Sequence, residues 1–187
     1  MRLNSYTQPN GITCGPTALL NIASTLDPSL STTPQGILEL AQEMGVTPQA
    51  GTGHVQMQKG LERLNLPILR GLSSVPGLTD EAPDCIQTVF TDQTIIPTWP
   101  DPRKKQEDRQ TLNRVADYAR RAAQHYFILM RTFWHGCPHW IAVTVDDNGS
   151  FLIADGARAL YAIKDFDLMQ SWMWRDFDCF LIARDQK

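Results

Sequence analysis

The sequence predicts an α+β fold, with a mostly helical N-terminal half and an antiparallel sheet after it. Hydrophobic residues recur at helical spacing up to about residue 66, whereas short hydrophobic runs of strand length begin at Tyr126. Helices and strands therefore occur in separate blocks and do not alternate as in parallel sheets. With 187 residues, of which 42% are hydrophobic, the chain is expected to form a single domain, residues 1–187, whose core needs neither a disulfide nor a metal ion.

The N-terminal half is expected to contain three helices. Residues 14–26 place their leucine and isoleucine side chains on one stripe, and Pro16 lies in the first turn, where a missing N–H group costs little. Residues 33–45 begin with Thr-Pro and end with Met-Gly, which are start and stop signals of a helix. A third helix, from about residue 54 to 64, follows the Gly-Thr-Gly of residues 51–53.

The C-terminal part is expected to form strands. YFILM from Tyr126, WIAVTV from Trp140 and FLIA from Phe151 are short hydrophobic runs, and the DDNGS between the last two is typical of a hairpin turn. Residues 67–102 contain six prolines and show no period, so we interpret them as loops or strands. The remaining expected elements are a charged helix at about 101–123, an amphipathic segment at 166–174 and a final strand at 179–183.

Charge and hydropathy exclude several functions. The chain carries 17 Lys plus Arg against 20 Asp plus Glu, a net charge of −3, whereas a nucleic-acid binder normally shows a clustered basic excess. No hydrophobic run approaches the roughly 18 residues of a membrane span, and the N-terminus lacks the hydrophobic segment of a secretion signal. We therefore expect a soluble protein, cytoplasmic as synthesised, that binds no nucleic acid, membrane or cofactor.

Cys14 is the strongest candidate for a nucleophile. It begins the first expected helix, where unpaired backbone N–H groups and the positive end of the helix dipole favour a thiolate. Gln8 lies six residues before it, and its side-chain amide could direct a donor to the same point as the Cys14 N–H, which would complete an oxyanion hole. The other cysteines form no CxxC pair and are interpreted as structural thiols: Cys85, Cys137 and Cys179.

His139 is the best candidate for the base that such a thiolate needs. If the hairpin pairs Val145 with Phe151, then Ile141 lies opposite Asp155. His139 and Asp155 would then point to the same face, one diagonal step of about 7–8 Å apart. Asp155 could orient the imidazole ring as the third member of a Cys-His-Asp set. A shift of the register by one residue would place the two side chains on opposite faces.

The histidines also allow other interpretations. His135, Cys137 and His139 are spaced like metal ligands. The glycine and the proline between them should interrupt the strand, and the paired spacing of zinc sites is absent, so we expect no metal site. His54 is interpreted as a helix cap or a surface group, and His125 as a structural residue.

The tryptophans divide into one candidate site residue and a structural group. Trp140 adjoins the expected base and is predicted to line the site and bind substrate. The others are interpreted as core or rim residues: Trp99, Trp134, Trp172 and Trp174.

These motifs resemble those of the papain-like cysteine peptidases, and in particular the bacteriocin-processing peptidase domains of the double-glycine type. The resemblance rests on Gln8, Cys14-Gly15-Pro16-Thr17, His139-Trp140 with the hydrophobic strand after it, and Asp155-Gly156, in the same order and spacing. It implies a papain-like fold. It also implies four roles: Cys14 as nucleophile, His139 as base and acid, Asp155 as orienting residue and Gln8 as oxyanion donor.

The sequence departs from that family in three ways. The residue after the aspartate is usually Pro and is Gly156 here, and residues 67–110 exceed what a minimal peptidase domain needs, so we expect a family-variable insertion there. The familiar domains are attached to a membrane exporter, whereas this sequence contains no membrane span. The resemblance therefore implies a free-acting peptidase, such as a bacterial effector or toxin that is delivered into a target cell and restrained by an immunity protein.

Three functions remain open from the sequence. The first is a cysteine peptidase that cleaves a protein substrate near a small-residue or Gly-Gly site. The second is a glutamine deamidase or transglutaminase, because the same triad would form a thioester with either kind of acyl donor. The third is a catalytically silent binding module on the same fold.

Overall fold

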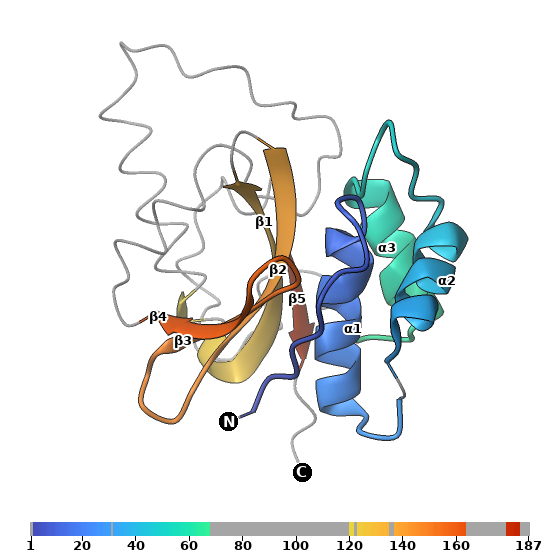
Figure 1. Cartoon of the computed structure of the whole chain (residues 1–187). Helices are drawn as coiled ribbons and strands as arrows, with labels where there is room; N and C mark the ends of the chain where they lie inside the picture. Colours follow the sequence, from blue (N-terminus) through green and yellow to red (C-terminus); the bar gives the residue numbers. More distant parts are fainter. Residues whose placement is uncertain are drawn as a thin grey trace, which may run out of the picture.

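A computed structural model describes residues 2–30, 32–67, 120–121, 123–134, 137–163 and 179–183. In this part of the chain, three helices form a layer against a five-stranded antiparallel sheet (Figure 1). The helices come first in the sequence and the strands last, which confirms the predicted α+β order. The expected insertion beyond Pro67, the first part of the charged helix and the amphipathic segment at 166–174 lie outside the described residues.

The three helices match the predicted ones. They are α1 (Cys14–Leu26), α2 (Pro34–Met44) and α3 (His54–Arg63). The Thr33 side chain caps α2 by accepting a hydrogen bond from the Gly36 N–H at 3.1 Å, and α2 ends at Gly45 in left-handed backbone (φ 76°). α1 is the central helix of the layer, since every residue from Cys14 to Ser24 is buried.

The described strands follow the order β4-β3-β2-β1-β5 in the sheet. Their bounds are β1 Tyr126–Trp134, β2 Cys137–Val145, β3 Phe151–Asp155, β4 Ala159–Ile163 and β5 Cys179–Ala183. The β2–β3 hairpin has the predicted register, with Val145 opposite Phe151 and Val143 opposite Ile153. The register on which the proximity of His139 and Asp155 depends is therefore confirmed.

Two details of the strand prediction are wrong. β2 includes Pro138, although the sequence indicates an interruption there. The proline fits because β2 pairs at this point with β1 alone among the described strands, and its pairing with β3 starts only at Ala142. β4 is not predicted at all, although its residues, ALYAI, form a short hydrophobic run like those of the predicted strands. Leu160, on this last strand of the described sheet, is 43% exposed.

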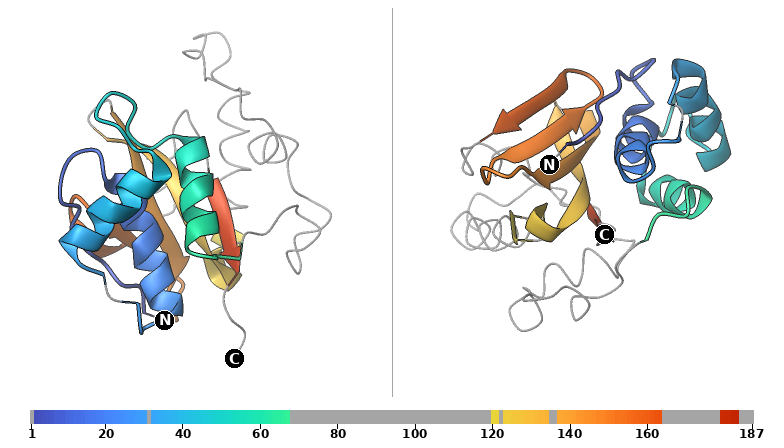
Figure 2. Two further views of the ribbon diagram at one scale, coloured as in Figure 1. Left: turned by 90° about the vertical axis from the view of Figure 1, so that its right-hand side faces the viewer. Right: turned by 90° about the horizontal axis from the view of Figure 1, so that it is seen from below.

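The hydrophobic core lies between α1 and the sheet. Leu19 and Ile22 of α1, Phe127 of β1 and Trp140 of β2 are each at most 1% exposed. Figure 2 shows the three helices on the same side of the sheet. Because α1 begins with Cys14 and β2 carries the histidine next to Trp140, packing in this core sets the distance between the expected nucleophile and base.

Residues 3–8 form a further segment, which we call the N-terminal strap. Figures 1 and 2 show the strap beside α1, between this helix and the β3–β4 hairpin. Leu3 at one end is 1% exposed. At the other end, the Gln8 N–H donates a hydrogen bond to the Gly156 carbonyl at 2.9 Å. The strap therefore places Gln8 beside the turn that follows Asp155.

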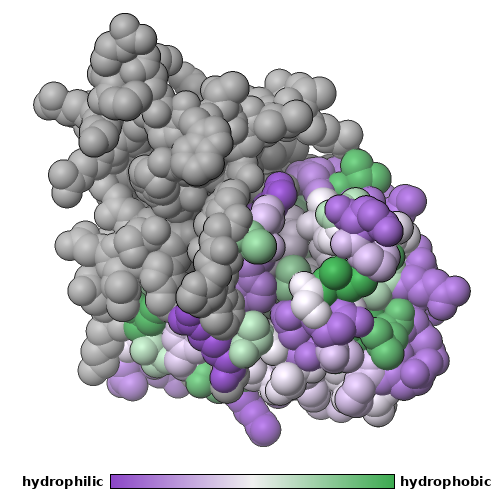
Figure 3. All heavy atoms as spheres, turned by 45° about the horizontal axis from the view of Figure 1, so that its top comes forward, coloured by the Kyte–Doolittle hydropathy of each residue, from purple (hydrophilic) through white to green (hydrophobic). Residues whose placement is uncertain are grey.

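The surface of the described residues carries few large hydrophobic side chains. Leu38, Val55 and Leu160 are the exposed ones among them, at 38%, 48% and 43%. On the face drawn in Figure 3, hydrophobic residues (green) are dispersed among polar ones (purple), as on the surface of ordinary globular proteins. Within the described ranges, no helix has both the length and the hydrophobicity needed to traverse a bilayer.

Candidate active site

Cys14 occupies the first position of α1 and is 6% exposed. The residue before it, Thr13, makes no side-chain capping bond to the helix. The thiol therefore lies at the positive end of the helix dipole, where the first backbone N–H groups stabilise negative charge. Cys14 lies close enough to His139 to raise the pKa of the imidazole, so the structure brings the expected nucleophile and base together.

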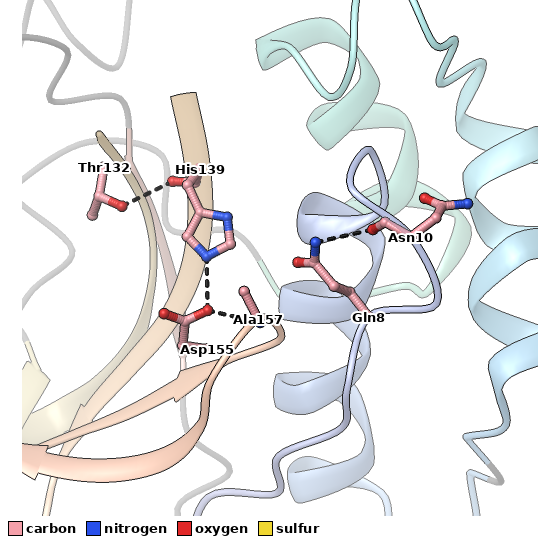
Figure 4. Close-up of polar contacts among 6 residues, drawn as sticks. All are labelled: Gln8, Asn10, Thr132, His139, Asp155 and Ala157. Carbon is pink, nitrogen blue, oxygen red and sulfur yellow. Dashed lines mark hydrogen bonds and ion pairs between the residues drawn. The ribbon is translucent and has the colours of Figure 1, made fainter. Parts of the chain in front are cut away.

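His139 forms a buried pair with Asp155. The imidazole Nε2 lies 2.7 Å from the Asp155 Oδ1, and the two side chains are 9% and 4% exposed. Because an ionised carboxylate only accepts hydrogen bonds, Nε2 carries the proton in this pair. Figure 4 shows the other ring nitrogen directed toward the start of α1, where Cys14 lies. The ring is thus oriented by Asp155 on one side and free to exchange a proton with the thiol on the other.

Asp155 is itself held in place by the turn that follows it. Its Oδ1 also accepts a hydrogen bond from the Ala157 N–H at 2.9 Å (Figure 4). The strand of the histidine is fixed as well, because the Thr132 hydroxyl of β1 donates to the His139 carbonyl at 3.1 Å. Hydrogen bonds from neighbouring residues therefore hold both partners in position, as a preorganised acid–base pair requires.

The surroundings of His139 favour its protonated form. Burial, the largest single influence, lowers its pKa, but the hydrogen bonds to Asp155 and Cys14 and the negative charges of these two groups raise it. Together they place the pKa of His139 at about 9 instead of 6.5. At neutral pH the ring is therefore an imidazolium, the form that can donate a proton to a leaving group.

The raised pKa of His139 gives a first prediction. In Asp155→Asn the amide oxygen can still accept the imidazole hydrogen bond, but the charge is gone, so the pKa of His139 should fall well below about 9. NMR titration of the His139 ring measures this directly. The raised pKa also means that His139 stabilises the fold fully below pH 6.5 and that this contribution is lost as the pH rises through about 9. If the NMR titration midpoint of His139 is the same in Asp155→Asn as in the wild type, Asp155 is not the group that raises its pKa.

Gln8 reaches the same region from the N-terminal strap. Its Nε2 donates a hydrogen bond to the Asn10 carbonyl at 2.9 Å, which fixes which end of the amide is the nitrogen. Figure 4 shows the amide on the side of α1 that faces His139 and Asp155. An amide nitrogen carries two hydrogens, so one N–H remains for a second acceptor. The carbonyl oxygen of the amide is buried without a hydrogen-bond partner among the described residues, and it is the atom directed toward His139 and Asp155 in Figure 4, so the role of Gln8 as oxyanion donor stays a prediction.

Gly156, a departure from the family pattern, has a packing reason. A Cβ atom at this position would lie 2.9 Å from the Thr17 Cγ2 and 3.2 Å from the Gln8 Cβ. Both distances are shorter than ordinary van der Waals contact. Glycine therefore allows the turn after Asp155 to lie directly against α1 and the strap.

A second close approach joins the start of α1 to the loop before α3. A Cβ atom at Gly15 would lie 2.3 Å from the Thr52 Cγ2, so only a glycine allows this contact. The Thr52 carbonyl in turn accepts a hydrogen bond from the Trp140 Nε1 at 2.7 Å. Gly15, next to Cys14, and Trp140, next to His139, thus both contact Thr52.

Trp140 does not have the position that its predicted substrate-binding role requires. Its indole is 1% exposed and packs near Phe180, with ring centroids 6.0 Å apart. A side chain without accessible surface cannot contact a substrate in this conformation. The structure instead places Trp140 in the core, where its N–H bond to Thr52 stabilises the loop against α1.

The contact between Gly15 and Thr52 gives a second prediction. Gly15→Ala should lower the free energy of unfolding by about 1–3 kcal/mol, because the methyl group overpacks this contact. Gly36→Ala in α2 is the matched control, since its Cβ would lie 3.4 Å from the nearest atom and alanine favours helices by about 1 kcal/mol. Urea denaturation of both variants measures the difference. Equal stabilisation by both substitutions would contradict the close packing.

The other candidate residues lie apart from this site or outside the described part. His54 packs against Phe180, with ring centroids 4.6 Å apart, and Cys137 is exposed on β2. His125 is exposed beside Tyr126. Within the described ranges, no group of three or more His, Cys, Asp or Glu side chains could hold a metal ion. Several residues named above lie outside the described ones: Cys85, Trp99, His135, Trp172 and Trp174.

Tyr161 is a site neighbour that the sequence does not reveal. It lies on β4 opposite Ile153, one diagonal step from Asp155. Burial raises the pKa of Tyr161, and the negative charge of Asp155 raises it further, so its hydroxyl remains protonated. β4 is not predicted from its residues, so the sequence carries no signal that Tyr161 lies near Asp155.

Comparisons with known proteins indicate a fold but no sequence relative. No protein-family model matches the chain, and no curated protein matches its sequence. Among solved structures, the chain is similar to the peptidase domain of Streptococcus ComA, which is described as a bifunctional ABC transporter involved in a quorum-sensing pathway. The TM-score is 0.54 at 15% identity, and the match covers 97% of this chain and 99% of that one. This likeness shows a shared fold and confirms the predicted papain-like, α+β architecture.

Proposed function

We propose that this chain is a cysteine peptidase that uses Cys14, His139 and Asp155. The observation that carries the proposal is the buried pair of His139 and Asp155, 2.7 Å apart, close to a cysteine at a helix N-terminus. Acyl transfer by a thiolate requires such a set of nucleophile, acid–base group and orienting group. The fold shared with a peptidase domain supports the proposal.

The proposed reaction has two steps. The Cys14 thiolate attacks the carbonyl carbon of a peptide bond, and the oxygen that becomes negative accepts hydrogen bonds from the Cys14 N–H and the Gln8 amide. His139 then gives its proton to the leaving amine as the C–N bond breaks, which leaves a thioester on Cys14. Water, deprotonated by His139, attacks the thioester, and the acid product leaves as the thiolate re-forms.

The substrate class follows from the resemblance of the motifs. We propose protein substrates that are cleaved near a small-residue or Gly-Gly site. Action as an effector in a target cell, and an immunity protein that restrains it, remain predictions from the same resemblance. The second candidate function, deamidation or transglutamination of a glutamine side chain, would use the same three residues.

Mass spectrometry of proteins from cells that express the wild type or Cys14→Ala tests the proposal. New protein termini that occur with the wild type and not with Cys14→Ala are the expected result. A mass gain of about 1 Da on an intact target would instead indicate deamidation. Termini that persist in Cys14→Ala, or no Cys14-dependent change in any protein, would refute a peptidase.

A further inference from the structure

The N-terminal strap is attached to α1 by a row of polar side chains. The Tyr6 N–H donates to the Asn21 Oδ1 at 2.9 Å, and the Asn4 N–H donates to the Thr25 Oγ1 at 2.9 Å. The Asn4 side chain adds a bond to the Ser24 Oγ at 3.1 Å. Positions 21, 24 and 25 have the i, i+3, i+4 spacing of one helix face. This face of α1 is therefore polar where it meets the strap.

Asn21 is unusual for a residue in the middle of a buried helix. It is 0% exposed, and its Nδ2 is buried without a hydrogen-bond partner among the described residues. A buried amide costs free energy unless its groups are hydrogen-bonded, and a leucine of similar size would avoid this cost. The bond that Asn21 does make goes to the backbone of the strap, at Tyr6.

The bond from Asn21 lies close to the expected oxyanion donor. Tyr6 is two residues before Gln8, whose own N–H is bound to the Gly156 carbonyl at 2.9 Å. The strap is thus bound to α1 at Tyr6 and to the turn after Asp155 at Gln8. Since Cys14 begins the same helix, a strap bound to α1 keeps Gln8 at a fixed place relative to the Cys14 N–H.

We propose that Asn21 is a positioning residue for Gln8. Oxyanion stabilisation needs both donors within about 2.7–3.1 Å of one oxygen, and these two donors come from separate segments, the strap and α1. By binding the Tyr6 backbone, Asn21 joins the strap to α1 and so holds the backbone of Gln8 at a fixed place relative to the Cys14 N–H. The inference rests on the proposed function, because Gln8 stabilises an oxyanion only if Cys14 attacks a carbonyl.

The test compares Asn21→Leu with variants that separate positioning from folding. Asn21→Leu should lower kcat about tenfold and change KM less than about twofold. The variant weakens an interaction that stabilises charge only in the transition state, so substrate binding changes little. The Tyr6 amide should exchange its hydrogen faster. Thr25→Val, which removes the acceptor at the far end of the strap, is the matched control and should leave kcat within about twofold of the wild type.

A double-mutant cycle with Gln8→Ala shows whether Asn21 affects kcat through Gln8. If Asn21 acts through Gln8, Asn21→Leu should lower kcat little further once Gln8 is alanine. Asn21→Asp keeps an acceptor oxygen of the same shape and should restore most of kcat. An equal loss of kcat in both backgrounds, or an unchanged kcat although Tyr6 has lost protection, overturns the proposal. Unchanged hydrogen-exchange protection of the Tyr6 amide in Asn21→Leu would also overturn the proposal.

Two further outcomes are distinguishable from these. If Asn21→Leu does not fold, Asn21→Ala, which only removes atoms, takes its place in the same cycle. If cleavage survives Cys14→Ala, or the wild type cleaves nothing, the proposed function fails, and the role of Asn21 fails with it. If cleavage by the wild type depends on Cys14, and Asn21→Leu and Asn21→Ala both turn over at the wild-type rate, then only the role of Asn21 is refuted.

Discussion

Cys14→Ala is expected to lower kcat/KM for substrate cleavage by on the order of 10⁵-fold or more, to the level of the uncatalysed reaction. The physical reason is that alanine provides no atom that can attack the carbonyl, so no thioester forms. His139 and Asp155 would remain in place, because their 2.7 Å contact does not depend on the thiol. Cleavage kinetics and trapping of the acyl-enzyme at acid pH measure the loss.

Cys137→Ala is the matched control for this variant. Cys137 is the other cysteine with a described side chain, and it is exposed near the start of β2. Its loss should leave kcat/KM within about twofold of the wild type. Iodoacetamide should label Cys14 faster than Cys137, since a thiolate at a helix N-terminus next to an imidazolium is the more reactive form. Equal labelling, together with no cleavage by the wild type, would favour the silent binding module.

His139→Ala is expected to lower kcat/KM by about 10³- to 10⁴-fold. The variant loses the proton donor for the leaving amine and the base for the attacking water, and general acid–base catalysis contributes about 10²- to 10⁴-fold. It also loses the positive charge beside the Cys14 thiolate. The residual activity should no longer show the decline above about pH 9 that the pKa of His139 imposes on the wild type.

His125→Ala controls for the loss of a histidine in general. His125 is exposed next to Tyr126 and outside the site, so its removal should leave both the rate and the pH profile unchanged. Imidazole added to His139→Ala should restore part of the rate if the only deficit is the missing acid and base. A His139→Ala variant with the wild-type pH profile would show that another group transfers the proton.

The β2–β3 hairpin shows how much a local pattern can determine. The hydrophobic runs WIAVTV and FLIA and the turn residues between them indicate the hairpin, and its register puts His139 and Asp155 on one face. The start of α1 at Cys14 is equally local, since a hydrophobic stripe and Pro16 in the first turn define it. These features need only neighbouring residues, so they are readable in the sequence.

Trp140 shows where the same reasoning fails. Its position next to His139 favours a site residue, but its indole N–H bonds to the carbonyl of Thr52, 88 residues away in the chain. Asn21 and Tyr161 are missed for the same reason. One contacts the strap 15 residues before it, and the other depends on the unpredicted strand β4. Their partners are brought near only by the packing of the helices against the sheet.

The α+β order, the helix that begins at Cys14 and the register that puts His139 and Asp155 on one face are predictable from the sequence. Each follows from periodicity, turn chemistry or helix-start residues, which act over a few residues. The burial of Trp140 and the position of Gln8 between α1 and the turn after Asp155 depend instead on tertiary contacts. Those contacts join segments far apart in the chain, and they form because a buried polar group must find its hydrogen-bond partner wherever the packed core places it.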